Sequence, residues 1–372
     1  MTQLSGTPAV ASPNLAGVPG SETLRISSLA AELRRAGRSI VSLSAGEPDF
    51  DTPEHIRAAG AAAIAEGKTR YTPTAGVAPL REAIAEKLER ENGIRRTPDE
   101  VLVSAGAKQV LFNACMALFG PGDEVLIPAP YWVSFPPMVR LARATPVIVT
   151  TGLDRGWKVD PEGLRQHLTP RTRGLILNSP SNPTGAVYDK QELAGIAEFC
   201  VAHGLWILSD EIYETLCYDS AEAAGAPSIA GLDPEVAAHT VTVNGFSKTY
   251  AMTGWRIGYG AAPRAAIEAM EIVQSHCSSN ASSVGQAAAL AALTEREASR
   301  RAVTSMRSAF ERRRGRLVAG LDGLEGVANR PPDGAFYLFS DVRGVLDSRG
   351  AGSSASSADD FCDWLLREHG LA

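Results

Sequence analysis

The sequence lacks the patterns that membrane proteins, disulfide-bonded proteins and nucleic-acid-binding proteins require. No apolar run approaches the roughly 20 residues of a membrane-spanning helix. Five cysteines are scattered over 372 residues without a CxxC pair, which favours reduced thiols over a disulfide framework. The formal net charge is −6, and no long basic run occurs. We therefore expect a cytoplasmic protein that binds neither a membrane nor a nucleic acid.

Several catalytic motifs are also missing. There is no GxGxxG for a dinucleotide, no phosphate-binding P-loop and no GxSxG nucleophile elbow. Zinc chemistry would need HExxH or clustered His and Cys, but the six histidines are dispersed. We expect no metal site, and the chemistry must come from other residues.

The composition is that of a large globular protein. Hydrophobic residues make up 44% of the chain, enough for a sizeable core, and the length suggests roughly two domains of about 150 residues. Residues 1–20 are rich in Ala, Pro, Gly and Ser and lack the features of a secretory signal, so a flexible N-terminal arm is expected.

Short apolar runs alternate with helical patterns from residue 101 onward. The runs are VLVS (101–104), EVLIPAP (124–130), PVIVT (146–150), GLILN (174–178), LWILS (205–209) and VTVN (241–244). This alternation predicts βαβ units and a mostly parallel sheet, an α/β fold. Helices are expected at 22–37, 55–67 and 108–119, and the segment DGAFYLFSDV (333–342) looks like a further strand.

Polar or aromatic residues follow four of these runs. They are Trp132, Asn182, Asp210 and Lys248. Ligands bind at the carboxyl ends of parallel strands, so these side chains should meet at one edge. Each also has a structural interpretation: Trp132 as packing, Asn182 as a turn residue and Asp210 as a helix cap. Their joint occurrence at one edge favours a site.

Lys248 is the residue around which this site would be organised. It lies between Ser247 and Thr249 in a turn after a buried strand, and Arg256 follows eight residues later. A desolvated lysine near another cation can lose its proton and act as a nucleophile. The alternative is an ordinary surface lysine in a loop, and the motif alone leaves both open.

Three small-residue or turn positions are weaker candidates. Gly46, within AGEPDFDTP, could bring its backbone amide close to an anion or be an ordinary turn glycine. AGAK, residues 105–108, opens a helix whose amides suit a phosphate. Tyr71 lies in a turn where no local core needs its ring.

The chain resembles the class I aminotransferases, pyridoxal-phosphate enzymes of fold type I, and is most similar to the bacterial aspartate aminotransferase branch. The motifs that carry the resemblance are AGEPDFDTP, YTPTAGVAPLREAI, AGAKQVLFN, PGDEVLIPAPYWVSFP, NSPSNPTGAVY, SDEIYE and NGFSKTYAMTGWRIGY. The resemblance implies a three-layer α/β/α large domain with a mostly parallel sheet and a smaller α+β domain built from both termini. The implied boundaries are 21–48 and 301–372 for the small domain and 49–300 for the large one.

The resemblance implies a role for each candidate residue. Lys248 would form the Schiff base with pyridoxal 5′-phosphate and carry a proton. Asp210 would pair with the pyridinium nitrogen, Tyr213 and Asn182 would bind the phenolic oxygen, and Trp132 would stack on the ring. Further cofactor contacts would come from Tyr71, Gly106, Ala107, Lys108, Ser247 and Arg256. Substrate contacts would come from Gly46, Lys108, Trp132 and Asn182.

The resemblance also implies a substrate class and a partner. Lys108 can meet the distal carboxylate of aspartate or glutamate, so an acidic amino donor and a 2-oxo acid acceptor are expected. Tyr71 would reach the phosphate of a neighbouring subunit, which implies a homodimer with shared active sites.

One departure from the family leaves alternatives open. The family continues past the last helix into a strand and an arginine that grips the substrate α-carboxylate, whereas this sequence stops at Ala372. We expect the sequence to be incomplete, because every cofactor residue is intact. Prephenate, aromatic or alanine specificity, a pyridoxal-phosphate lyase and an inactive cofactor-binding relative all remain open.

Overall fold

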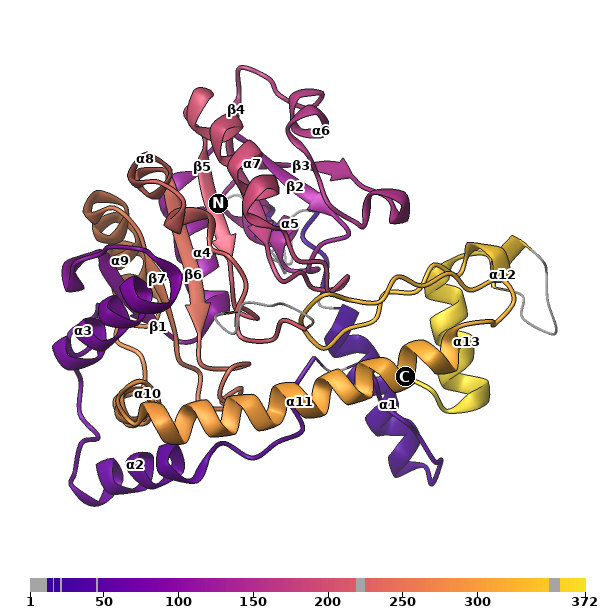
Figure 1. The fold of residues 1–372 in the computed structure, drawn as a ribbon, viewed down its shortest axis with the longest axis horizontal. Coiled ribbons are helices and arrows are strands. Elements are labelled where there is room, and N and C mark those ends of the chain that lie inside the picture. The colour runs from indigo at the N-terminus through magenta and orange to yellow at the C-terminus, as the bar shows by residue number, and fades with distance from the viewer. Residues whose placement is uncertain (1–11, 16, 21, 45, 219–224, 348–354) are drawn as a thin grey trace, which may run out of the picture.

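A seven-stranded sheet forms the centre of the computed structural model (Figure 1). The structure describes residues 12–15, 17–20, 22–44, 46–218, 225–347 and 355–372, so most of the expected N-terminal arm lies outside the described residues. The strands are β1 (Val101–Ser104), β2 (Glu124–Ala129), β3 (Thr145–Thr150), β4 (Thr172–Asn178), β5 (Trp206–Asp210), β6 (Thr240–Gly245) and β7 (Gly258–Ala261).

The strand order is β1-β7-β6-β5-β4-β2-β3. Strands β2 to β6 pair in parallel, as the βαβ pattern predicts, whereas β7 is antiparallel to both β1 and β6. The sequence pattern does not predict β7, because GYGA is short and holds two glycines that disfavour strands. Because β7 returns beside β6, the turn between them stays at the carboxyl edge of the sheet.

Helices cover both faces of this sheet, so the large part has three layers. The helices of the described chain, including those outside these layers, are α1 (Glu22–Arg35), α2 (Glu54–Ala65), α3 (Ala78–Lys87), α4 (Ala107–Leu118), α5 (Phe135–Leu141), α6 (Pro161–Arg165), α7 (Lys190–Ala202), α8 (Pro234–Ala238), α9 (Arg264–Cys277), α10 (Ser283–Thr294), α11 (Arg296–Leu321), α12 (Arg343–Asp347) and α13 (Ala358–His369). The predicted helices correspond to α1, α2 and α4, within two residues at each end. A π-helical turn, η2 (Leu88–Asn92), extends α3.

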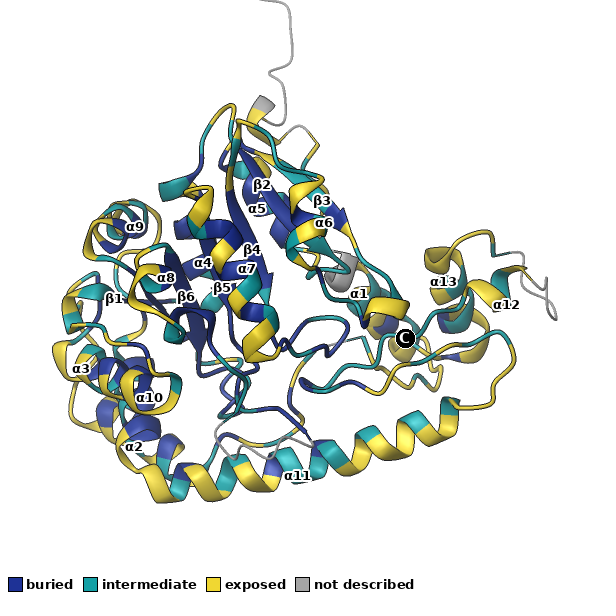
Figure 2. Ribbon diagram, turned by 45° about the horizontal axis from the view of Figure 1, so that its top comes forward, coloured by how far each residue is buried: buried dark blue, intermediate teal, exposed yellow. Residues whose placement is uncertain are grey.

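Alternate strand residues point to opposite layers. Leu208 packs in the cluster with α4, α5 and α9, whereas its neighbour Ile207 packs in the cluster with α6 and α7. A third cluster joins β1 and β7 to α2, α3 and α10. Figure 2 shows the resulting buried sheet between the helical layers. Burial on both faces explains why the strands read as continuous apolar runs.

The segment 333–342 does not form the predicted strand. Its described residues make only two isolated bridges, Cys217 with Gly334 and Ala328 with Asp341. Ala335 has φ of +56°, a left-handed conformation that interrupts an extended chain. Phe336 instead stacks on Phe310 of α11, with ring centroids 5.1 Å apart. Aromatic packing on α11 therefore replaces strand pairing here.

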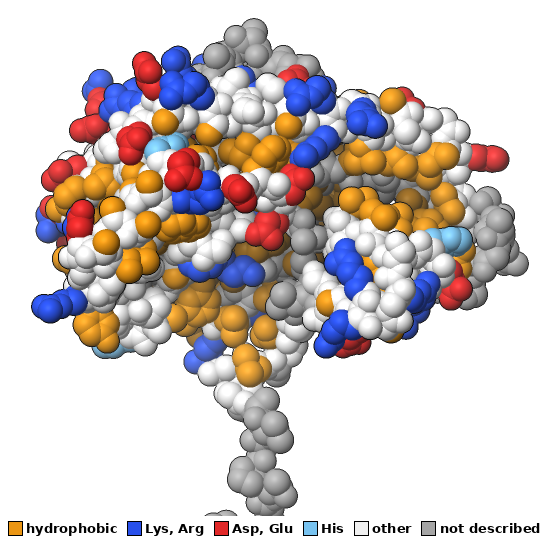
Figure 3. Space-filling view, turned by 90° about the horizontal axis from the view of Figure 1, so that it is seen from below, with side chains coloured by type: hydrophobic (Ala, Val, Ile, Leu, Met, Phe, Trp, Pro, Cys, Tyr) orange, Lys and Arg blue, Asp and Glu red, His pale blue; other side chains and the backbone are white. Residues whose placement is uncertain are grey.

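Helix α1 and the C-terminal helices α12 and α13 meet in a smaller lobe (Figure 1). Helix α11 runs along one side of the molecule toward α1, α12 and α13 (Figure 1). Arg25 pairs with Asp363 at 3.3 Å, and Val41 bridges to Leu371 in parallel. The helices of the described ranges include none with the length and apolar character to cross a membrane. On the face drawn in Figure 3, acidic and basic side chains are interspersed.

Candidate active site

The carboxyl ends of β4, β5 and β6 bring three predicted site residues together. Asn178 of β4 pairs with Asp210 of β5, which pairs in turn with Val243 of β6, and Lys248 lies in the turn after β6. The backbone N–H of Asn182 donates to Asn178 Oδ1 at 2.7 Å. Asn178 Nδ2 donates to the Asp210 carbonyl at 2.8 Å. Parallel register thus places Asn182, Asp210 and Lys248 at one edge.

Asp210 is a buried carboxyl group with few hydrogen-bond donors near it to offset the cost of burying its charge. The residue is 4% exposed, and its Oδ1 accepts a hydrogen bond from the Ile212 N–H at 3.3 Å. Burial raises the pKa of Asp210 to about 7, and the Ile212 N–H and the Lys248 ammonium oppose that rise. A cation placed against this carboxylate would favour the ionised form.

The Lys248 amine points into the same space. Its Nζ donates to the carbonyl of Gly46. It also lies 5.9 Å from the ring centroid of Tyr213 and 5.6 Å from that of Phe336. The carbonyl and the aromatic rings hold the half-buried amine between the β6–β7 turn and the segment at residue 46.

This environment favours the neutral, unprotonated form of the Lys248 amine. Burial is the main cause that lowers the pKa of Lys248 to about 8, and the Arg256 cation lowers it further. The carboxylates of Glu47 and Asp210 act in the opposite direction. An amine with a pKa near the working pH can both attack a carbonyl carbon and carry a proton. Lys248 therefore has the properties of a nucleophile rather than of a solvated surface lysine.

Two tyrosines form a hydroxyl pair beside Asn182. The hydroxyls of Tyr213 and Tyr337 are 2.6 Å apart, and Asn182 Nδ2 donates to Tyr337 Oη at 3.4 Å. Burial raises the pKa of Tyr337 to about 12 and raises that of Tyr213 well above its usual value. Both phenols therefore keep their protons at neutral pH, so the group can donate to an oxyanion.

Arg256 lies against the start of α4. Its Nη2 donates to the Ala105 carbonyl at 3.1 Å, and its Nη1 donates to the Thr253 carbonyl at 2.9 Å. Gly106, the N-cap, has φ of +91°, and a Cβ there would lie 2.6 Å from Arg256 Nη2. The left-handed backbone favours glycine here, and a Cβ would displace the guanidinium. A guanidinium beside the N-terminus of a helix is suited to bind a phosphate.

Close packing of β7 fixes the same helix start. A Cβ on Gly258 would lie 2.3 Å from the backbone nitrogen of Ala107, so glycine lets the strand touch α4. Ser247 is buried in the β6–β7 turn, one residue before Lys248. The turn that leads into β7 thereby places Arg256 against the start of α4.

Lys108 and Trp132 form a cation–π pair, with Nζ 4.8 Å from the ring centroid. Burial and the Arg256 cation lower the pKa of Lys108. Trp132 also packs edge-on against Phe135, with centroids 5.5 Å apart, so part of its role is structural. The pair supplies a positive charge and an aromatic face beside the α4 start.

Gly46 and Tyr71 occupy very different positions. A Cβ on Gly46 would lie 2.2 Å from Tyr337 Oη, so glycine is needed for that close approach. Tyr71 is 92% exposed on this single chain. The structure therefore brings Gly46 into the site and leaves Tyr71 at the surface.

Sequence reasoning missed three residues that line this site: Tyr337, Phe336 and Glu47. The first two lie in the segment predicted as a strand, where the aromatic pair directly after Ala335 was the available signal. Glu47 lies in AGEPDFDTP and receives a hydrogen bond from Thr253 Oγ1. Its contact with the Lys248 region depends on residues some 200 positions apart and has no local signal.

The donor set fits pyridoxal 5′-phosphate, the cofactor that the resemblance implies. A pyridinium nitrogen matches the buried Asp210 carboxyl, and a phosphate matches Arg256 with the α4 amides. A phenolic oxygen matches Tyr213 and Asn182, and an aldehyde matches the Lys248 amine. Within the described ranges, no group of three His, Cys, Asp or Glu side chains could hold a metal ion.

The buried carboxyl groups predict a pH-dependent stability for the cofactor-free protein. Burial raises the pKa of Asp210 from 3.8, and that of Glu211 from 4.5, to about 7. Their contribution to stability is fully present below the unfolded-state pKa values and is lost as the pH rises through about 7. We expect the free energy of unfolding to fall by several kcal/mol between about pH 5 and about pH 8, at roughly 1.4 kcal/mol per pKa unit.

Urea unfolding at the two pH values checks this expectation. Asp210→Asn should show a clearly smaller fall than wild type. Asp233→Asn is the matched control, because Asp233 is exposed and asparagine also caps a helix well. An equal fall in wild type and Asp210→Asn would contradict the assignment.

Comparison with known proteins places this site in a family. Residues 38–372 match the family described as aminotransferase class I and II. The chain is 46% identical over 366 residues to the aspartate/prephenate aminotransferase of Cereibacter sphaeroides, covering 98% of this chain and 90% of that protein. It is 44% identical over 354 residues to the aspartate aminotransferase of Rhizobium meliloti, covering 95% and 85%.

Solved structures agree with these sequence matches. The crystal structure of the Rhizobium meliloti aspartate aminotransferase superposes with a TM-score of 0.91 at 42% identity, covering 97% of this chain and 90% of that one. The Thermus thermophilus aspartate aminotransferase with maleate gives 0.89 at 44% identity, with the same coverage. The predicted fold type I is confirmed. The chain therefore belongs to the class I and II aminotransferases, enzymes that use pyridoxal 5′-phosphate to move an amino group between amino acids and 2-oxo acids.

Proposed function

We propose that this aminotransferase takes its amino group from aspartate or glutamate and gives it to a 2-oxo acid. The observation that carries the proposal is the Lys248 amine, with its pKa lowered to about 8, at the strand edge that also holds the buried Asp210. The names of the relatives, aspartate aminotransferase and aspartate/prephenate aminotransferase, support an acidic donor and make prephenate a second candidate acceptor.

Four residues would hold the cofactor at its three polar ends. Asp210 would keep a proton on the ring nitrogen, Tyr213 and Asn182 would donate to the phenolic oxygen, and Arg256 would bind the phosphate. Gly106, Ala107 and Ser247 would add backbone and hydroxyl donors to the phosphate, and Trp132 would cover the ring. When bound, pyridoxal 5′-phosphate supplies an aldehyde that condenses with amines and a protonated ring that withdraws electrons.

Lys248 would do two kinds of work in turn. Its neutral amine would hold the cofactor through Nζ, and once displaced by substrate the same amine would move a proton to and from the substrate Cα. The Gly46 carbonyl, which accepts from Nζ, keeps the amine directed into the pocket. The flanking rings of Tyr213 and Phe336 limit access of water to it.

Lys108 would select the acidic substrate. Its ammonium lies over Trp132 beside the α4 start, where a distal carboxylate would meet a partly dry positive charge. Gly46, Trp132 and Asn182 would complete the substrate contacts. This arrangement favours aspartate and glutamate over donors with a neutral side chain.

Lys108→Met is expected to raise KM for aspartate about 10- to 100-fold, because one hydrogen bond to a charged group contributes about 1.5–3 kcal/mol. KM for alanine should change much less. Steady-state kinetics with both donors measures the difference, and Lys108→Arg, which keeps the charge, is the matched control. Equal losses for the two donors would remove Lys108 from the distal-carboxylate site.

Incubation of the cofactor-loaded protein with aspartate alone tests the reaction. We expect one equivalent of oxaloacetate per site and conversion of the bound cofactor to its amine form, reversed by 2-oxoglutarate. Release of ammonia would indicate a lyase. No conversion above that of Lys248→Ala would indicate an inactive relative. Comparing 2-oxoglutarate with prephenate as acceptor then ranks the two candidates.

We further propose a cytoplasmic homodimer in which the partner subunit's Tyr71 completes each site. The exposure of Tyr71 supports this, because an aromatic ring 92% exposed on one chain is available to a second. The five cysteines are unpaired thiols, as in a reducing compartment. Residues 21–48 and 301–372 would form the small domain and 49–300 the large one. Sedimentation analysis that finds only monomer would contradict the shared site.

A further inference from the structure

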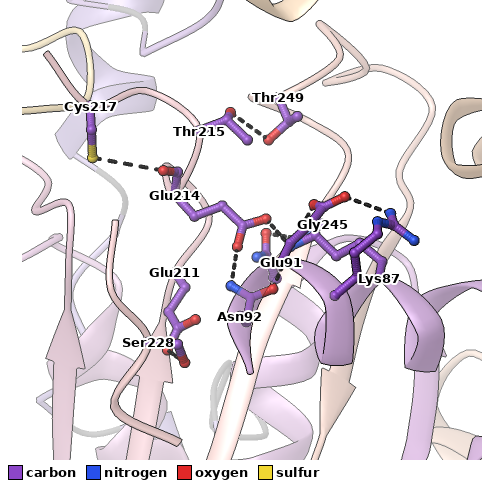
Figure 4. Close-up of polar contacts among 12 residues, drawn as sticks. Lys87, Glu91, Asn92, Glu211, Glu214, Thr215, Cys217, Ser228, Gly245 and Thr249 are labelled. Carbon is purple, nitrogen blue, oxygen red and sulfur yellow. Dashed lines mark hydrogen bonds and ion pairs between the residues drawn. The ribbon is translucent and has the colours of Figure 1, made fainter. Parts of the chain in front are cut away.

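A buried polar cluster lies behind the turn that carries Tyr213. In Figure 4 the Glu214 carboxylate faces the end of α3 and the π-helical turn after it. Lys87 Nζ donates to Glu214 Oε1, and Asn92 Nδ2 donates to Glu214 Oε2 at 2.7 Å. Lys87 Nζ also donates to Asn92 Oδ1 at 2.8 Å. The three side chains therefore form a closed ring of hydrogen bonds.

Two members of this ring are almost fully buried, and Asn92 is half-buried. Lys87 is 4% exposed and Glu214 6%. Burial would lower the pKa of Lys87, but the carboxylates of Glu214 and Glu91 outweigh it, so the pKa is raised and the lysine stays charged. A buried ion pair adds little net stability compared with apolar packing, yet it is costly to break on one side. Such a pair acts mainly by fixing geometry.

The turn is also tied to the Lys248 segment. Thr215, directly after Glu214, shares a hydrogen bond of 3.1 Å between its hydroxyl and that of Thr249, directly after Lys248. Thr249 is 3% exposed. The Glu214 N–H donates to the Glu211 carbonyl at 3.0 Å, which closes the turn between Asp210 and Tyr213. One polar path thus runs from α3 through the Tyr213 turn to Lys248.

We propose that Lys87, Glu214, Thr215 and Thr249 are positioning residues that fix the Tyr213 hydroxyl relative to the Lys248 amine. The inference rests on the proposed function of that site. The four residues act through Tyr213 and Lys248 and touch no reacting atom. Because Tyr213 and Lys248 lie on separate turns, side-chain cross-links between the turns help to set the distance between the phenol and the amine.

Glu214→Gln tests the role of these positioning residues. The glutamine amide has one oxygen, so it cannot accept from both Lys87 and Asn92 without a change in their hydrogen bonds. The matched control is Glu124→Gln. Glu124 is equally buried, at 7%, and pairs with Arg171 and Thr169 at the start of β2, the opposite edge of the sheet from the site. Both variants should lower the melting temperature of the cofactor-free protein.

Only Glu214→Gln should alter the site. We expect its dissociation constant for pyridoxal 5′-phosphate to rise about tenfold and kcat with aspartate to fall about tenfold, with KM within about twofold. The pH midpoint of the bound cofactor's absorbance should also shift. Thr249→Val should give smaller changes of the same kind, and Thr249→Ser, which keeps the hydroxyl, should restore wild-type values.

The outcomes separate an effect on the geometry of the site from an effect on folding stability alone. Equal cofactor affinity, kcat and absorbance midpoint in Glu214→Gln and Glu124→Gln would overturn the proposal. Should Glu214→Gln fail to fold, identical behaviour of Thr249→Val and Thr249→Ser would overturn it instead. Wild-type protein that neither binds the cofactor nor converts aspartate would overturn the proposed function itself. That result is distinct from a failure of the positioning proposal.

Discussion

Lys248→Ala is expected to lower kcat for aspartate by at least about 10⁴-fold, the upper range for loss of a positioned acid–base group. The variant loses both the amine that holds the cofactor and the group that moves the substrate proton. The rise of oxaloacetate in a single turnover measures the chemical step directly. Cofactor should still bind, though more weakly, because Arg256 and Asp210 remain.

Two further variants separate the nucleophile from the charge. Lys248→Arg keeps a cation but stays protonated at any working pH, so it should be as inactive as alanine. Lys68→Ala removes an exposed lysine paired with Glu66 and should leave kcat unchanged. An active Lys248→Arg variant would show that the residue acts only as a charge.

Asp210→Asn is expected to lower kcat about 10²- to 10³-fold, the effect of removing one preorganised charge from a catalytic site. The neutral amide cannot hold a proton on the ring nitrogen, so the ring would withdraw electrons poorly. Stopped-flow measurement of the reaction with aspartate gives the rate of the chemical step. KM should change little, because the buried Asp210 carboxyl would contact the cofactor ring and not the substrate.

The same variant should gain stability while it loses activity. Without cofactor, the Asp210 carboxylate is buried against a single backbone N–H, so its removal relieves an electrostatic cost above about pH 7. This opposition between stability and function is typical of active sites. Asp233→Asn should change neither quantity. An Asp210→Asn enzyme with full kcat would remove Asp210 from the mechanism.

The buried strands were predictable because each is a local apolar run. VLVS, EVLIPAP, PVIVT, GLILN, LWILS and VTVN all became strands, and helices formed at their predicted places within two residues. Strand ends also follow from the sequence, so the edge shared by Asn182, Asp210 and Lys248 could be inferred from parallel pairing alone. The pattern of apolar residues does not predict β7, because its glycines allow close contact with α4 and have low strand propensity.

Six of the seven strands, the strand-end residues and, through the motifs, the resemblance to the aminotransferases therefore follow from local sequence. Which distant segments complete the site depends on the packing of the folded chain. Tyr337 reaches Tyr213 because Ala335 turns the chain away from an extended path, and Glu214 meets Lys87 across 127 positions. The lowered pKa of Lys248 and the raised pKa of Asp210 arise from burial, which no local pattern of residues encodes.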